Sequence, residues 1–76
     1  MNNDRRKRIT TIMKKMDQLR DEMTELADEE QEAFDNLPGG LQESERGQKM
    51  EKSAETLSET ADEQQETIEH LETIFD

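Results

Sequence analysis

The chain has 76 residues with a formal net charge of −11; 28% of the residues are hydrophobic, and there is no Cys, Trp or Tyr. So short and polar a chain can bury little apolar surface on its own, and we expect partners to contribute to its stability. The absence of cysteine excludes a disulfide framework and a thiolate metal site. Neither a secretory signal nor a membrane-spanning run is recognisable, which predicts a soluble, cytoplasmic protein.

The charge is distributed unevenly along the chain. Residues 1–20 hold seven Lys or Arg against two Asp, whereas residues 21–45 hold ten acids and no base. Few apolar residues and a high net charge are also typical of disordered chains. The spacing of the apolar residues therefore has to decide between a fold and disorder.

The first half of the chain is predicted to be one helix over residues 4–36. Its apolar residues alternate in steps of three and four, the heptad pattern of helices that pack side by side. The predicted seam, meaning the column that faces the other helix, is Ile9, Ile12, Met16, Leu19, Met23, Leu26, Glu30, Ala33 and Leu37.

Residues 37–43 are predicted to be a turn. Pro38 disfavours helical dihedrals at Leu37, and Gly39 and Gly40 can adopt positive φ after a helix end. We expect Leu41 to fold back over the end of the two helices.

A second helix is predicted over residues 44–75, with Ser44 as its N-cap. Gly47 in its first turns is unfavourable for a helix, which predicts a close contact with Ala33. The predicted seam is Gly47, Met50, Ala54, Leu57, Ala61, Gln64, Ile68, Leu71 and Phe75.

The two seams pair in one register. If facing residues have numbers that sum to 80, Ile12 faces Ile68, Leu26 faces Ala54, and every seam position from Ile9 to Ala33 finds a partner between Gly47 and Leu71. The sequence therefore predicts an all-α, antiparallel two-helix hairpin forming a single domain over residues 1–76. Glu30 and Gln64 are interpreted as register-setting or exposed polar residues rather than ligands of a buried ion, since neither faces a second ligand.

Two helices alone leave apolar and small residues beside the seams unused. Such wide stripes are typical of bundles, so we expect self-association into a four-helix or larger bundle. The predicted oligomer interface is Met13, Ala27, Phe34, Thr60, Thr67 and Ile74.

No motif in the chain indicates catalysis. His70 is the only histidine, and the Pro38–Gly40 segment lacks the Lys and Ser/Thr of a phosphate-binding loop. Catalytic carboxylates need unequal, partly desolvated surroundings, which a uniformly acidic helix face does not offer. We expect no enzyme, no cofactor and no metal site.

Three charged or polar groups are candidate binding sites. Acidic side chains on the first helix form a band that either engages a basic partner or only keeps the protein soluble. The band is Asp21, Glu22, Glu25, Asp28, Glu29, Glu32 and Asp35. The hairpin tip, with Gln42, Ser44 and Arg46, is either a second binding surface or only a turn.

Basic residues form the third group. Arg5, Arg6, Lys7 and Arg8 either neutralise Glu69, Glu72 and Asp76 of the second helix or line an anion pocket in an oligomer together with Arg46 and Lys49. Without an aromatic residue to stack a base, and with a strongly negative net charge, direct nucleic-acid binding is not expected.

The segment "FDNLPGGLQESERGQKME", residues 34–51, resembles small bacteriophage proteins with an "NLP.GLQ.SERG" type of core. The resemblance implies no biochemical activity. It favours a non-enzymatic acidic binding protein, a phage-type inhibitor that blocks a basic host or defence component. Two alternatives stay open: an oligomeric sponge for a small anionic signal such as a cyclic nucleotide, and a structural coiled-coil component of a larger assembly.

Overall fold

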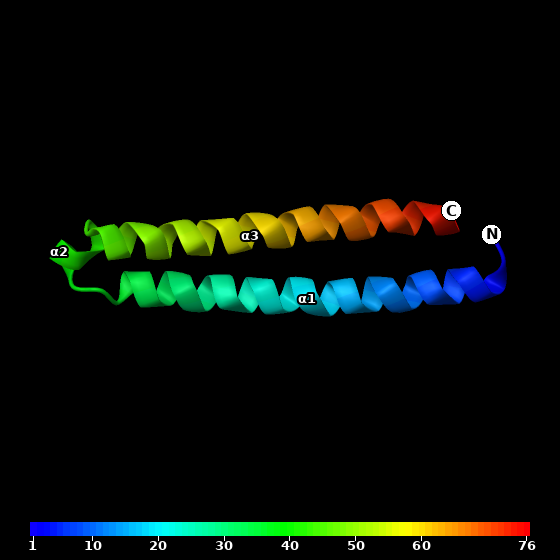
Figure 1. The fold of residues 1–76 in the computed structure, drawn as a ribbon, viewed down its shortest axis with the longest axis horizontal. Helices are drawn as coiled ribbons and strands as arrows, with labels where there is room; N and C mark the ends of the chain where they lie inside the picture. Colours follow the sequence, from blue (N-terminus) through cyan, green and yellow to red (C-terminus); the bar gives the residue numbers. More distant parts are fainter.

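The computed structural model describes all 76 residues and consists of helices only. Helix α1 (Asn3–Asp35) is followed by the short α2 (Gly39–Gln42), the long α3 (Glu45–Glu72) and a final 3₁₀ turn, η1 (Thr73–Phe75). α1 and α3 run antiparallel and pack along their length, with α2 at one end of the rod and both termini at the other (Figure 1). The rod measures 59 × 15 × 14 Å. The predicted all-α hairpin is confirmed, while its assembly into a bundle stays a prediction.

The start of α1 is fixed by a side-chain cap. The side chain of Asn2 accepts a hydrogen bond from the backbone N–H of Arg5 at 2.8 Å, which satisfies one of the free donors of the first turn. The helix ends at Asp35, one residue before the predicted boundary.

The turn is itself a short helix, which corrects one prediction. Gly39 and Gly40 do not adopt positive φ; they form the first turn of α2 after Pro38. The N–H of Leu41 donates to the carbonyl of Pro38 at 2.7 Å, so a helical turn satisfies the backbone here. Leu41 does not cover the end of the rod, since its side chain is exposed.

The start of α3 is capped as predicted. Ser44 Oγ accepts from the N–H of Gly47 at 3.2 Å. Gly47 is buried, and a Cβ there would lie 2.5 Å from the carbonyl oxygen of Leu41 and touch that of Gln42. The carbonyl ends of α2, rather than Ala33, therefore require glycine at this position; Ala33 itself is exposed.

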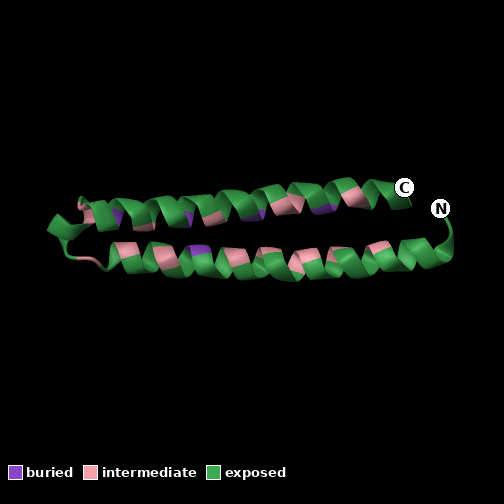
Figure 2. Ribbon diagram, viewed as in Figure 1, coloured by how far each residue is buried: buried purple, intermediate pink, exposed green.

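The seam of α3 is also confirmed. Four residues at intervals of seven are buried, Gly47 under the end of α2 and the other three against α1: Gly47, Ala54, Ala61 and Ile68. The neighbouring column is half-buried: Met50, Leu57, Gln64 and Leu71. Figure 2 shows the buried segments of α3, in purple, on the side that faces α1. Only Phe75, which lies in η1, is exposed.

The seam of α1 is partly wrong. Ile12, Leu19 and Leu26 are 50%, 53% and 51% exposed, although the sequence predicts them to face α3. The residue that follows each of them, and Phe34 after Ala33, is the one that α3 covers: Met13, Arg20, Ala27 and Phe34. The other predicted positions are half-buried: Ile9, Met16, Met23, Glu30 and Leu37.

The small residues at the centre of the α3 seam explain this rotation of α1. Glu30 and Met50 border the same depression and sum to 80 as predicted, but Ala27 and Ala54 border another and sum to 81. An alanine opposite an alanine lets two helix backbones approach closely, whereas Leu26 in that place would hold them apart. The register along the rod is retained, while a different column of α1 packs inward.

Candidate functional site

The hairpin has two open faces, one on each side of the seam. Glu30 of α1 lies with Met50 and Ser53 of α3 around an open depression on one side. Ala27 and Asp28 lie with Ala54, Glu55 and Glu59 around a depression on the other. Residues spaced by three, four or seven along a helix share a side, so these two sets assign the rest of each helix to a face.

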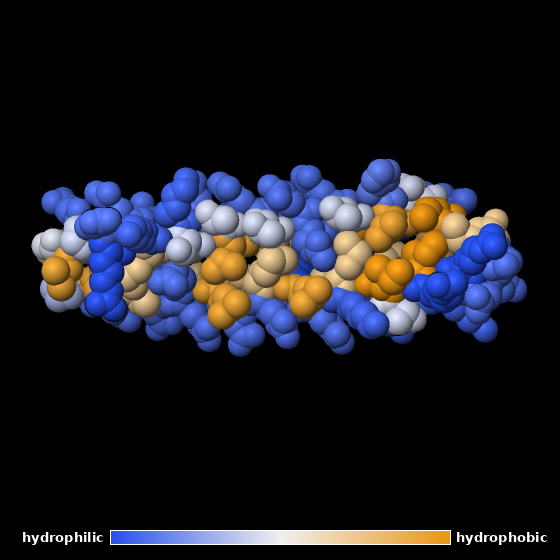
Figure 3. All heavy atoms as spheres, viewed as in Figure 1, coloured by the Kyte–Doolittle hydropathy of each residue, from blue (hydrophilic) through white to orange (hydrophobic).

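The first face, which we name the apolar face, carries Ile12, Leu19 and Leu26 of α1 and Met50, Leu57 and Leu71 of α3. Leu26 precedes Glu30 by one helical turn, and Leu19 and Ile12 precede Leu26 by steps of seven. An apolar band flanked by hydrophilic side chains runs along the rod between the two helices (Figure 3). The three aliphatic residues of α1 are each about half exposed, so α3 leaves this band largely open.

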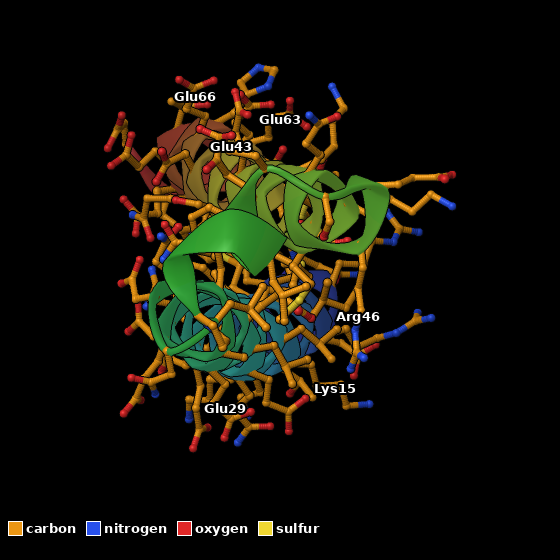
Figure 4. All side chains as sticks on the ribbon, turned by 90° about the vertical axis from the view of Figure 1, so that its left-hand side faces the viewer. Lys15, Glu29, Glu43, Arg46, Glu63 and Glu66 are labelled. Carbon is orange, nitrogen blue, oxygen red and sulfur yellow. The ribbon has the colours of Figure 1, made fainter.

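Four charged residues border the apolar face along α1. Arg8, Lys15, Glu22 and Glu29 follow one another at intervals of seven, and each lies three residues after or four before one of the exposed aliphatic residues. All four are exposed, and none belongs to an ion pair. Lys15 and Arg46 project to the same side in the end-on view (Figure 4). Sequence reasoning missed this column, although its seven-residue spacing is visible in the sequence.

The opposite face, which we name the acidic face, carries carboxylates and no large apolar side chain on its α3 side. Glu55 and Glu59 border its depression, and steps of three and four continue the row with Asp62, Glu66 and Glu69, all exposed. Like charges spaced by one turn repel one another. This face therefore repels anions and attracts cationic groups.

The predicted acidic band of α1 is exposed throughout. Glu29 points away from α3 in the end-on view (Figure 4). Asp21 pairs with Arg20 at 2.9 Å, and Asp35 accepts from Gln31 at 3.0 Å, but the other carboxylates form no ion pair. Five carboxylates of the band are thus free to meet a cationic partner: Glu22, Glu25, Asp28, Glu29 and Glu32.

Arg20 is the one cation in the α1 column that packs against α3. Its side chain is 27% exposed and reaches Asp17 at 3.2 Å and Asp21 at 2.9 Å. The hydrogen bond to Asp21 and the charges of both carboxylates raise the pKa of Arg20 above its ordinary value. The guanidinium is therefore charged at any ordinary pH, and it is already occupied within its own helix.

The basic cluster forms no direct ion pair with α3, so the pairing considered from the sequence is not observed. Arg5, Arg6, Lys7 and Arg8 are exposed, and none forms an ion pair with Glu69, Glu72 or Asp76. The other half of the predicted anion pocket, Arg46 and Lys49, lies near the α2 end of the rod, away from the termini. Lys49 pairs there with Glu45 at 3.2 Å, and Glu30 borders the same depression.

Two of the three predicted tip residues are used by the fold. Gln42 Nε2 donates to the carbonyl oxygens of Phe34 and Asp35 at 3.3 and 3.4 Å, so it points back to the end of α1. The last carbonyls of a helix have no partner within the helix; that of Phe34 accepts from the N–H of Leu37 at 3.1 Å, and Gln42 adds a donor to both carbonyls. Ser44 is the N-cap of α3, and of the three only Arg46 is exposed.

The predicted oligomer interface divides in the same way. Ala27 is buried and Met13 and Phe34 are half-buried against α3, so these three residues stabilise the hairpin itself. Thr60, Thr67 and Ile74 are exposed, and steps of seven from Ser53 place them on the apolar face.

The molecule has no group of three or more His, Asp or Glu side chains placed to hold a metal ion. None of its helices combines the length and the apolar composition needed to cross a bilayer. The fold and the two faces define an all-helical hairpin with surfaces suited to association. Comparisons of the chain with protein families, curated proteins and solved structures find no match.

Proposed function

We propose that the protein is a non-enzymatic binding protein that covers a basic surface of another protein and blocks it stoichiometrically. The supporting observation is the set of five free carboxylates on α1, which no basic side chain of the chain neutralises. Such a surface steers a cationic partner toward it over long distances and accelerates capture. In the cell, such a protein would act as a phage-type inhibitor of a host or defence component.

The experiment is capture of a partner from host lysate, followed by measurement of its affinity for three forms of the protein. The band variant Glu25→Gln/Asp28→Asn/Glu32→Gln removes three charges from α1. We expect it to weaken binding by at least about tenfold, and raised salt to weaken binding by the wild type, because charge pairs at an interface are screened.

The matched control removes the same number of charges from α3: Glu59→Gln/Asp62→Asn/Glu66→Gln. We expect it to bind nearly as tightly as the wild type. Equal losses for the two variants would mean that net charge, and not the band, governs binding. An affinity that does not change with salt would contradict the proposal.

A second candidate function, a structural coiled-coil component, is favoured by the open apolar face. Large apolar surfaces on small proteins mark sites of association. The nucleotide sponge receives less support, because the carboxylates of Glu30 and Glu45 share the depression of Arg46 and Lys49 and oppose an anionic ligand.

A further inference from the structure

We propose that the apolar face is the docking site of a second copy of this chain. In this dimer the two α1 helices lie antiparallel, with Leu19 of each copy at the two-fold axis. The proposal does not depend on the proposed function, because it uses only Glu22 and Glu29 of the acidic band and leaves Glu25, Asp28 and Glu32 free.

The exposed aliphatic residues are self-complementary under such an axis. Ile12 and Leu26 lie at equal distances in sequence on either side of Leu19. When the second α1 runs in the opposite direction, Ile12 of one copy meets Leu26 of the other, and Leu19 meets Leu19. This is the arrangement that a two-fold interface requires, since the same patch must fit itself.

The charged residues that border the apolar face along α1 change sign at Leu19. Along α1 the column reads Arg8, Lys15, Glu22, Glu29, so the two bases precede Leu19 and the two acids follow it. Antiparallel packing places Lys15 beside Glu22 of the other copy and Arg8 beside Glu29. Charges flanking an apolar seam select partner and orientation in this way in coiled coils.

The α3 side of the face fits the same axis. Met50 and Leu71 lie almost symmetrically about Ala61, which the register with a sum of 80 places beside Leu19 in the rod. The α3 residues next to these on the apolar face are small: Ser53, Thr60 and Thr67. They allow the second α3 to approach. The dimer is then a four-helix bundle. Its core combines the α3 residues of the apolar face with the exposed aliphatic residues of α1.

The available area is sufficient. A face of 59 by 15 Å corresponds to about 900 Å² per copy, and a standard stable interface buries about 800 Å² per partner. The acidic face has a similar size, but two acidic faces would bring like charges together. A second copy therefore fits the apolar face and is repelled by the other.

The test is the mass of the purified chain over a range of concentrations, measured by sedimentation equilibrium. We expect the wild type to approach twice the 8.9 kDa of one chain. Leu19→Asp places two carboxylates at the axis and should raise the dimer Kd by at least about 100-fold. Leu41→Asp, at a residue that is 51% exposed but lies at the tip, should leave the Kd unchanged.

If Leu19→Asp also loses its helical circular dichroism, it has unfolded and does not test the interface. A charge swap at the surface then tests it instead. Lys15→Glu should weaken the dimer about tenfold, and Lys15→Glu/Glu22→Lys should restore it, because the swap exchanges the two partners. Both residues are exposed, so neither change disturbs the hairpin.

A disulfide reports whether Leu19 lies at the dimer axis. Because the chain has no cysteine, Leu19→Cys should form a covalent dimer on oxidation, whereas Leu41→Cys should not. A wild-type chain that stays monomeric at all concentrations would overturn the proposal. So would a dimer that survives Leu19→Asp, fails to recover in the charge swap, or does not cross-link through residue 19.

Discussion

The apolar face and the acidic face lie on the same two helices, on either side of one seam, yet they carry opposite kinds of side chain. The seam between them is closed mainly by small residues, with Ala27, Ala54 and Ala61 buried. The larger aliphatic side chains of α1 stand outside on the apolar face, while the acidic face carries carboxylates. The contrast teaches that close backbone approach holds the hairpin together and leaves Ile12, Leu19 and Leu26 of α1 about half exposed.

Loss of a seam residue should have the largest effect on the single hairpin. Ile68 is 2% exposed, and Ile68→Ala should lower the free energy of unfolding by about 2–4 kcal/mol, because it removes buried methyl groups and leaves a cavity. Denaturant unfolding at low protein concentration, followed by circular dichroism, measures this cost.

Ile12→Ala removes the same atoms from a residue of the apolar face, so its cost can be compared directly with that of Ile68→Ala in the seam. At low concentration it should cost less than about 1 kcal/mol, because Ile12 is half exposed in the hairpin. Its cost should increase with protein concentration as the second copy covers it, whereas that of Ile68→Ala should change little. Equal costs for both variants at every concentration would remove the distinction between seam and face.

Enlarging a side chain, instead of truncating it, should also distinguish the seam from the apolar face. Ala54→Leu inserts a large group between the closely packed helices and should destabilise the hairpin by about 1–3 kcal/mol. Ser53→Leu adds a leucine at the neighbouring exposed position on the apolar face, where we expect a change within about 0.5 kcal/mol in the monomer. Thermal unfolding at low concentration compares the two; a larger loss for Ser53→Leu would show that the faces are wrongly assigned.

The smallest effect is expected on the acidic face. Glu55 and Glu59 lie one turn apart and repel each other, so Glu55→Gln/Glu59→Gln should raise the free energy of unfolding by about 0.5 kcal/mol in dilute buffer. Raised salt should remove the gain, since it screens the repulsion in the wild type. A gain that persists in high salt would have to come from something other than charge.

Much of the fold could be predicted from the sequence, because heptad spacing and the Pro38–Ser44 turn are local signals. The hairpin, its ends, the N-cap Ser44 and the α3 seam follow from them directly. The side of α1 that faces α3 could not be predicted in the same way. Ile12, Leu19 and Leu26 look like the stronger seam, and only the facing column of glycine and alanines on α3 makes Ala27 the better neighbour.

The candidate surfaces were less predictable, since they depend on that rotation. From the sequence, Gln42 looks like a free polar residue; the structure places it beside the carbonyls of Phe34 and Asp35 at the end of α1. The exposed carboxylates of α1 could be predicted because nearly every residue around them is charged or polar. The column from Arg8 to Glu29 becomes meaningful only once the residues beside it are known to be exposed.

The short helix α2 also determines the order in which the rod can assemble. Contacts next to it, such as that of Gln42 with Phe34, join residues close in the chain and close only a small loop, whereas contacts near the termini close a long one. We therefore expect the two long helices to zip from α2 outward, with Ile9 and Leu71 meeting last. The same ordering makes the terminal end of the rod the first part to fray.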